Sequence, residues 1–326
     1  PSLLKLLAIP ATDQAFKAVS DAVNSSNNEV SDAAILALSE WPNPDPVELL
    51  HQIATGSPNQ DHRILALRGY IQLAPLTQDP TTIYANALEL AKQDDEIRLI
   101  LSGLHLAGTR QALEIAESYM GNPDLKEEAY LAAVKVLNVY GWEDRPTALT
   151  LLESIADEAP TRKIRSQAKD LIDKMERYKS TLATWKGTQI FQIPGVSDGR
   201  KIFETVFEPE KDFDSEDIVW RVVLPVFEGG GRLDLEEVYG KIDFCCVYLR
   251  TVIHSPVDQE VKLEWKVDDY MKAWLNGEPT EAGTINLKKG ANPFIVKIGE
   301  HGGDWNFVCQ ITGTDGEPLD DLRFER

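Results

Sequence analysis

The spacing of apolar residues changes near residues 181–185. Before this point, apolar positions recur at intervals of three and four residues, which is the pattern of amphipathic α-helices. After it, short runs alternate apolar and polar residues and are separated by Asn-Gly, Gly-Gly and Asp-Gly turns, which is the pattern of strands. The sequence therefore predicts a multidomain chain, with an all-α part over residues 1–182 and an all-β part over residues 183–326.

The helical part contains four related blocks, at residues 47–75, 83–108, 112–140 and 148–175. Each block starts with a short amphipathic helix, passes through a polar turn and ends in a second helix. The blocks start roughly 25 to 38 residues apart, within the range of solenoids built from helix pairs. One pair cannot bury its apolar stripe alone, so we expect neighbouring pairs to stack. The blocks resemble HEAT-type repeats, which implies an α-solenoid but no particular activity.

The second part is expected to form an antiparallel β-sandwich, because many short strands follow one another at regular spacing. The residues Asn276 and Gly277 follow one of these strands and suit a tight type I′ hairpin turn. The expected strands are 189–193, 202–207, 218–224, 242–254, 261–267, 271–275, 285–287, 294–298 and 307–312.

Three segments of this part resemble galactose-binding-like jelly-roll domains. Residues 267–277 form an apolar strand that ends in Trp-Leu-Asn-Gly. Residues 287–297 contain a Gly-Ala-Asn turn before another apolar strand, and residues 302–307 read Gly-Gly-Asp-Trp-Asn-Phe. The resemblance implies a jelly-roll fold for residues 183–326.

The order of the two parts also resembles modular secreted proteins of planctomycete-type bacteria. Many of these carry a 3-keto-disaccharide hydrolase domain, which is absent from this chain. The resemblance implies an extracytoplasmic location, periplasmic or secreted, and a role beside a glycan-processing enzyme. The chain opens with Pro-Ser and shows no signal peptide, so we expect it to be a piece of a longer protein.

Carbohydrate binding is expected at two aromatic positions. Alternation along residues 271–275 places Trp274 on the face opposite the core, where a flat ring can stack on a sugar, with Asn276 beside it. Trp305 follows two glycines, and Asp304 and Asn306 on either side of it offer polar contacts. Burial of these rings in a core, or against the helical part, is the alternative interpretation.

A structural Ca²⁺ is a further expectation. The adjacent carboxylates Asp268 and Asp269 form the best acidic pair for a cation that prefers oxygen ligands. Asp198 and Asp315 are weaker candidates, because both precede glycine and ordinary Asp-Gly turns explain them.

Charge and cysteine content exclude several classes of function. The net charge is −20, with −9 in residues 1–182 and −11 in the remainder, so both parts would repel a nucleic-acid backbone. No apolar run approaches the ~20 residues that span a membrane, so no membrane insertion is expected. The three cysteines, Cys245, Cys246 and Cys309, are too few for a disulfide scaffold, and both a single disulfide and burial as free thiols remain open.

No catalytic motif is found, so no catalytic residue is assigned. The sequence favours a non-catalytic segment that binds carbohydrate or a partner protein or domain. Two alternatives remain open. The first is a pure protein–protein scaffold that uses the helical surface. The second is a glycoside-active enzyme, because paired carboxylates can be distant in sequence.

Overall fold

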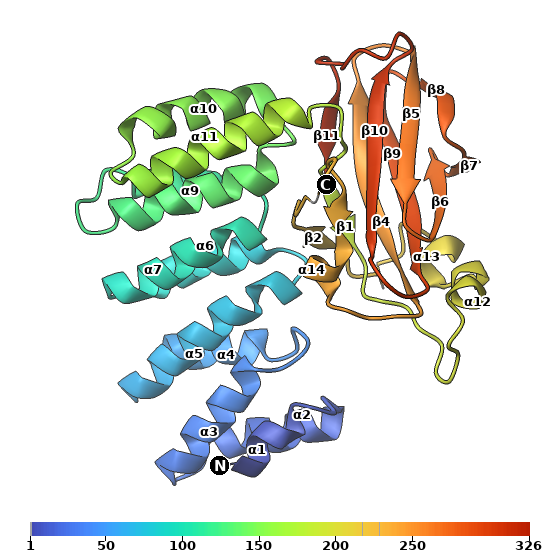
Figure 1. Ribbon diagram of the computed structural model, residues 1–326. Helices are drawn as coiled ribbons and strands as arrows, with labels where there is room; N and C mark the ends of the chain where they lie inside the picture. Colours follow the sequence, from blue (N-terminus) through green and yellow to red (C-terminus); the bar gives the residue numbers. More distant parts are fainter. Residues whose placement is uncertain (1, 217, 228) are drawn as a thin grey trace. The chain divides into compact units, whose positions relative to one another are not determined.

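The computed structural model describes residues 2–216, 218–227 and 229–326, and confirms a helical region followed by antiparallel sheets (Figure 1). The contacts divide the chain into two compact units, Pro1–Val136 and Leu137–Arg326. The change from helices to strands lies where the apolar spacing changes, since the last helix before the sheets ends at Arg177 and the first strand begins at Trp185.

The first unit consists of short helices that pack against their neighbours along the chain. Polar side chains begin several of them: Thr12 accepts a hydrogen bond from the Ala15 amide, and Thr109 accepts one from the Ala112 amide. The elements are α1 (Ser2–Leu7), α2 (Asp13–Val23), α3 (Asn28–Ser39), α4 (Val47–Gly56), α5 (Gln60–Leu73), η1 (Ala74–Leu76), α6 (Pro80–Leu90), α7 (Asp94–Gly103), η2 (Leu104–Leu106), α8 (Arg110–Ser118) and the first part of α9 (Lys126–Tyr140). Each of the four blocks seen in the sequence contains two helices, the last block falling in the second unit.

The second unit contains a helix pair, α10 (Arg145–Glu158) and α11 (Arg162–Arg177), together with both sheets. Specific contacts tie this pair to the β-region. Arg145 forms an ion pair with Asp320 at 2.6 Å, and Lys174 donates to the Pro225 carbonyl at 3.1 Å. The compact units therefore divide at Val136, whereas residues 181–185 mark the change of secondary structure.

Two antiparallel sheets form the β-region. The seven-stranded sheet has the order β2-β1-β4-β9-β6-β7, with β11 also paired to β4, and the four-stranded sheet has the order β3-β10-β5-β8. The strands are β1 (Trp185–Gly187), β2 (Arg221–Val223), β3 (Leu233–Asp234), β4 (Cys245–Ser255), β5 (Gln259–Val267), β6 (Tyr270–Leu275), β7 (Glu278–Thr280), β8 (Gly283–Leu287), β9 (Gly290–Glu300), β10 (Asn306–Gly313) and β11 (Arg323–Glu325).

One hydrophobic core is shared by the two sheets. Phe294 of β9 and Phe307 of β10, both fully buried, contribute to it from opposite sheets. Ala273 and Leu275 lie in the same core, so the facing predicted for β6 is confirmed. Burial of apolar area of this kind is the main stabilising contribution. The cysteines are free and buried.

The prediction of a strand at residues 202–207 is wrong. Residues Gly199–Glu204 form helix α12, because the Asp198 side chain accepts a hydrogen bond from the Lys201 amide and begins a helix there. A second short helix, α13 (Glu208–Lys211), follows. Residues 189–193 also form no strand and keep only a bridge between Phe191 and Cys246. A last short helix, α14 (Leu235–Tyr239), precedes β4.

Candidate functional site

The outer face of the seven-stranded sheet carries Trp274, the first carbohydrate candidate. Its ring is partly exposed on β6 and lies 5.3 Å from the ring of Phe213, with the planes inclined at 58°. Asn276, the second candidate, occupies the two-residue turn between β6 and β7 with φ of 55°. The Asn276 side chain donates to Asn292, so it stabilises the turn and does not contribute to the sheet face beside Trp274.

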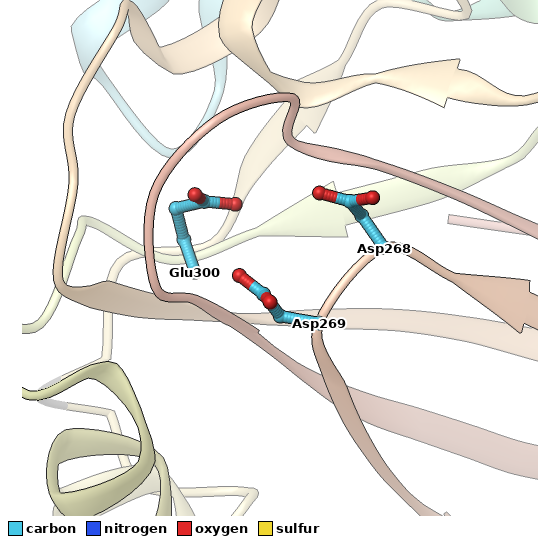
Figure 2. A group of neighbouring side chains, drawn as sticks. All are labelled: Asp268, Asp269 and Glu300. Atoms are coloured by element: carbon cyan, nitrogen blue, oxygen red, sulfur yellow. The ribbon is translucent and has the colours of Figure 1, made fainter.

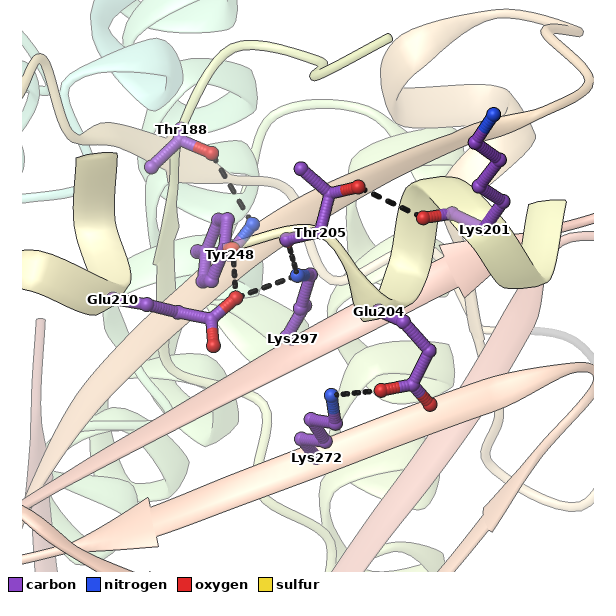
Figure 3. A network of polar contacts seen from close by, with 8 residues as sticks. All are labelled: Thr188, Lys201, Glu204, Thr205, Glu210, Tyr248, Lys272 and Lys297. Atoms are coloured by element: carbon purple, nitrogen blue, oxygen red, sulfur yellow. Dashed lines mark hydrogen bonds and ion pairs between the residues drawn. The ribbon is translucent and has the colours of Figure 1, made fainter. Parts of the chain in front are cut away.

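A buried polar network holds helices α12 and α13 against this face (Figure 3). The Lys297 side chain is fully buried and donates to the Thr205 carbonyl at 2.7 Å and to Glu210 Oε1 at 2.5 Å. The Tyr248 hydroxyl donates to the same oxygen at 2.6 Å. Burial and the charge of Glu210 raise the pKa of Tyr248 well above its usual value. The network satisfies a buried ammonium group, and its geometry gives it a structural role.

The second group of carbohydrate candidates lies at the end of the connection between β9 and β10 and at the first residue of β10. Trp305 is only 2% exposed and packs against Tyr239 at 5.6 Å, so its ring presents no face to a ligand. Asn306 is also buried, and its side chain accepts from Arg232 at 3.4 Å. Asp304 alone of this group is exposed. The structure therefore does not bring the five carbohydrate candidates together on one surface.

The predicted acidic pair gains a third carboxylate in the structure. Asp268 and Asp269 connect β5 to β6, and Glu300 is the last residue of β9. One carboxylate oxygen from each of the three residues lies within 4.8 Å of the other two. Figure 2 shows the carboxylates converging from these two segments. An all-oxygen set of this kind suits a hard cation such as Ca²⁺.

The electrostatics of this cluster favour a positive charge. Burial, followed by the charges of Asp269 and Asp268, raises the pKa of Glu300 to about 7, while the Gly302 amide opposes the shift. Burial, followed by the charges of Asp269 and Asp304, also raises the pKa of Asp268. Ionisation of Glu300 and of Asp268 is therefore less favourable than in water unless a cation is present.

Glu300 was not among the metal ligands predicted from the sequence, although its position in β9 provides a signal for it. Phe294, Val296 and Ile298 of β9 belong to the core shared by the two sheets, so the next inward position of the strand falls on Glu300. A carboxylate that continues a core-facing alternation, at the end of a strand, indicates a buried charge that needs a partner.

Cavities also occur away from these residues. In the first unit, a cavity of about 540 Å³ lies among α5, α6 and α7, and Arg68, Asp95 and Leu99 contribute to its lining. In the second unit, a smaller cavity of about 240 Å³ lies between α10 and the C-terminal residues, lined in part by Arg145 and Asp320.

Comparisons with known proteins identify no family. No family model matches the chain, and no curated protein matches it. Within the described ranges, every helix is too short or too polar to cross a bilayer. A solved structure of a de novo designed 16-helix transmembrane nanopore is similar at a TM-score of 0.13 and 19% identity, over 54% of this chain and 53% of that one. A likeness at this level supports no conclusion about fold or function.

Proposed function

We propose that the chain is a non-catalytic binding segment of a larger extracytoplasmic bacterial protein, accessory to glycan processing. In this proposal the helices form a HEAT-type solenoid, and the two sheets form a jelly roll that binds carbohydrate. The observation that carries the carbohydrate assignment is the position of Trp274. Its ring is partly exposed on the outer face of a sheet, where an apolar ring face can stack on the apolar face of a pyranose.

The surroundings of Trp274 support this assignment. Phe213 lies against the indole and adds apolar surface. On the same face of β6, Lys272 forms an ion pair with Glu204 at 2.8 Å, with both side chains at least 36% exposed. An aromatic surface bordered by charged groups that can form hydrogen bonds is typical of sugar-binding sites, which combine stacking with a few directional polar contacts.

Screening the full chain against a panel of polysaccharides and oligosaccharides, by calorimetry, tests this proposal. We expect binding of at least one glycan, a loss of more than tenfold in affinity for Trp274→Ala, and retention for Trp274→Phe. Leu99→Ala, in the helical unit, serves as the control and should bind as the wild type does. Failure of the folded chain to bind any glycan would refute the carbohydrate assignment. Release of reducing sugar during the screen would refute a non-catalytic role.

The second candidate function is a protein–protein scaffold. The cavity of about 540 Å³ among α5, α6 and α7 favours it, because its lining includes Leu99, which is 37% exposed, and the charged side chains of Arg68 and Asp95. Exposed apolar residues bordered by charges are common in protein interfaces. Titrating the chain with the separately expressed remainder of the parent protein tests this function. Binding that is weakened by Leu99→Asp and unaffected by Trp274→Ala would support the scaffold.

A further inference from the structure

The end of the β-region that holds Asp268 and Asp269 is a place where the chain crosses twice between the two sheets. Asp268 and Asp269 join β5 of the four-stranded sheet to β6 of the seven-stranded sheet. Residues 301–305 join β9 to β10 in the opposite sense. Backbone and side-chain bonds link these connections: the Asp268 amide donates to the Asn306 carbonyl at 3.1 Å, and the His301 amide donates to Asp269.

Glu300 is the residue that this arrangement leaves unexplained. Its side chain is 1% exposed, and neither carboxylate oxygen accepts a hydrogen bond of good geometry from the described residues, although the nearby Gly302 amide partly opposes the rise in its pKa. It occupies the last inward position of β9 and points toward Asp268 and Asp269 (Figure 2). Buried ionised groups in proteins are normally paired or coordinate a metal, so a carboxylate in this position calls for a positive partner.

Acidic neighbours surround Glu300 on more than one side. Besides Asp268 and Asp269, Asp243 contributes a negative charge near it. Asp304 lies near Asp268, and the charge of Arg232, whose side chain also donates to Asn306, partly opposes the rise in the pKa of Asp268. A single proton neutralises one of these carboxylates, whereas a divalent cation neutralises two and binds oxygens from three. The excess of negative charge therefore favours a divalent ion.

We propose that Asp268, Asp269 and Glu300 form a Ca²⁺ site that fastens the two sheet-crossing connections to each other. The donors are all oxygens, with neither sulfur nor imidazole in the cluster, which selects a hard cation. Opposite ligands of Ca²⁺, each at 2.3–2.6 Å, stand about 4.6–5.2 Å apart, whereas Mg²⁺ brings its ligands to about 4.2 Å. The three donor oxygens all lie within 4.8 Å of one another, so that one Ca²⁺ can reach all three.

This site is independent of the proposed glycan binding, since Trp274 lies on the outer face of the sheet and Glu300 points inward. Its role is structural. By joining residues that follow β5 to the residue that ends β9, a bound ion stabilises the folded state by an amount that grows with the logarithm of the ratio of its concentration to its Kd.

Calorimetric titration of the full, EDTA-treated chain with CaCl₂ and with MgCl₂ tests the proposal. We expect one Ca²⁺ per chain, weaker Mg²⁺ binding, and a rise in Tm of several degrees when Ca²⁺ exceeds its Kd a hundredfold. Glu300→Gln keeps the size of the side chain and removes its charge. It should weaken Ca²⁺ binding more than tenfold, while its Tm in EDTA equals or exceeds that of the wild type.

Two further variants make the test decisive. Asp268→Asn changes an exposed side chain and should also weaken Ca²⁺ binding more than tenfold, even if Glu300→Gln does not fold. Glu281→Gln, an exposed substitution of the same kind between β7 and β8, should leave binding unchanged. Absence of Ca²⁺ binding by the folded wild type would overturn the proposal. Equal affinities in the wild type and in Asp268→Asn would overturn it as well.

Discussion

The side-chain amide of Asn276 donates a hydrogen bond to the side-chain carbonyl of Asn292 across 3.1 Å. Asn276 begins the turn between β6 and β7, and Asn292 is fully buried near the start of β9. The two residues belong to two separate segments, which read Trp-Leu-Asn-Gly and Gly-Ala-Asn. This hydrogen bond gives both asparagines a structural role, because it links the turn between β6 and β7 to the start of β9.

Asn292→Asp should destabilise the protein strongly. The Asn292 amide nitrogen donates to the carbonyls of Ile253, Lys288 and Gly290. In the aspartate variant, a carboxylate oxygen would replace the amide nitrogen and face these three carbonyl oxygens, and a negative charge would be buried. We expect the free energy of unfolding to fall by about 3 kcal/mol. Urea titration followed by circular dichroism measures the change. Asn286→Asp, at an exposed position of β8, is the control and should shift it by less than about 0.5 kcal/mol. Equal effects of the two substitutions would contradict the role of Asn292.

The fold was predictable from the sequence where a strand has one face in the core. Strands β5, β6 and β10 lie within two residues of their predicted limits, because their alternation reflects burial on one side. The segment before β2 was not predictable in this way. Its apolar residues Phe191 and Phe207 pack on Tyr248, on the outer face of the sheet, and such packing imposes no period on the sequence.

The candidate site was predictable only in part, for a related reason. Asp268 and Asp269 are adjacent, so a sequence scan finds them, but Glu300 joins them through strand pairing that the sequence does not display. Trp274 is partly exposed, as its place in the β6 alternation predicted. Trp305 stands in a connection without a period, and only the packing against Tyr239 reveals its burial.

The ion pair between Lys297 and Glu210 should stabilise the fold only while both partners are present. Among the described residues, Lys297→Met leaves the Glu210 carboxylate with a single donor, Tyr248, in a largely buried setting. We expect the free energy of unfolding to fall by about 3 kcal/mol. Adding Glu210→Gln removes the unpaired charge and keeps an acceptor for Tyr248, so the double variant should recover part of that loss. Urea unfolding of the four proteins in this double-mutant cycle measures the coupling.

An exposed ion pair provides the control for this cycle. Lys211 and Glu208 are paired in α13 with side chains 56% and 73% exposed. Lys211→Met should change the free energy of unfolding by less than about 1 kcal/mol, because exposed pairs contribute little. A loss in Lys297→Met no larger than that in Lys211→Met would show that the buried pair does not anchor the segment.

The cysteines should be unreactive in the folded protein. All three are buried and free, and burial raises the pKa of Cys245 and of Cys246 to about 12. Burial also raises the pKa of Cys309. Since the thiolate is the reactive form, we expect no thiol to react with an aromatic disulfide reagent at pH 8 within minutes, and three to react in urea. A Glu281→Cys variant, with an exposed thiol, is the positive control. Rapid reaction of any wild-type thiol without denaturant would contradict the burial.

Lys174 should make stability rise with pH in the alkaline range. Its ammonium group donates to Asn138 and to the Pro225 carbonyl and lies 4.7 Å from the centre of the Phe227 ring. Burial lowers its pKa from 10.5 to about 8. Between these two values the unfolded chain binds more protons than the folded one, so stability increases as pH rises from 8 to 10.5 and is independent of this group below pH 8.

Comparing the wild type with Lys174→Met isolates this contribution from other groups that titrate in the same range. From pH 8 to 10.5, the free energy of unfolding of the wild type should gain about 1 to 2 kcal/mol relative to the variant, after allowance for the partial exposure of the side chain. Lys169→Met, at an exposed position of the same helix, should show no such difference. Urea titrations at four pH values measure all three proteins. Parallel pH profiles of the wild type and Lys174→Met would mean that the ammonium group is hydrated in solution and that α11 packs less closely on residues 225–227.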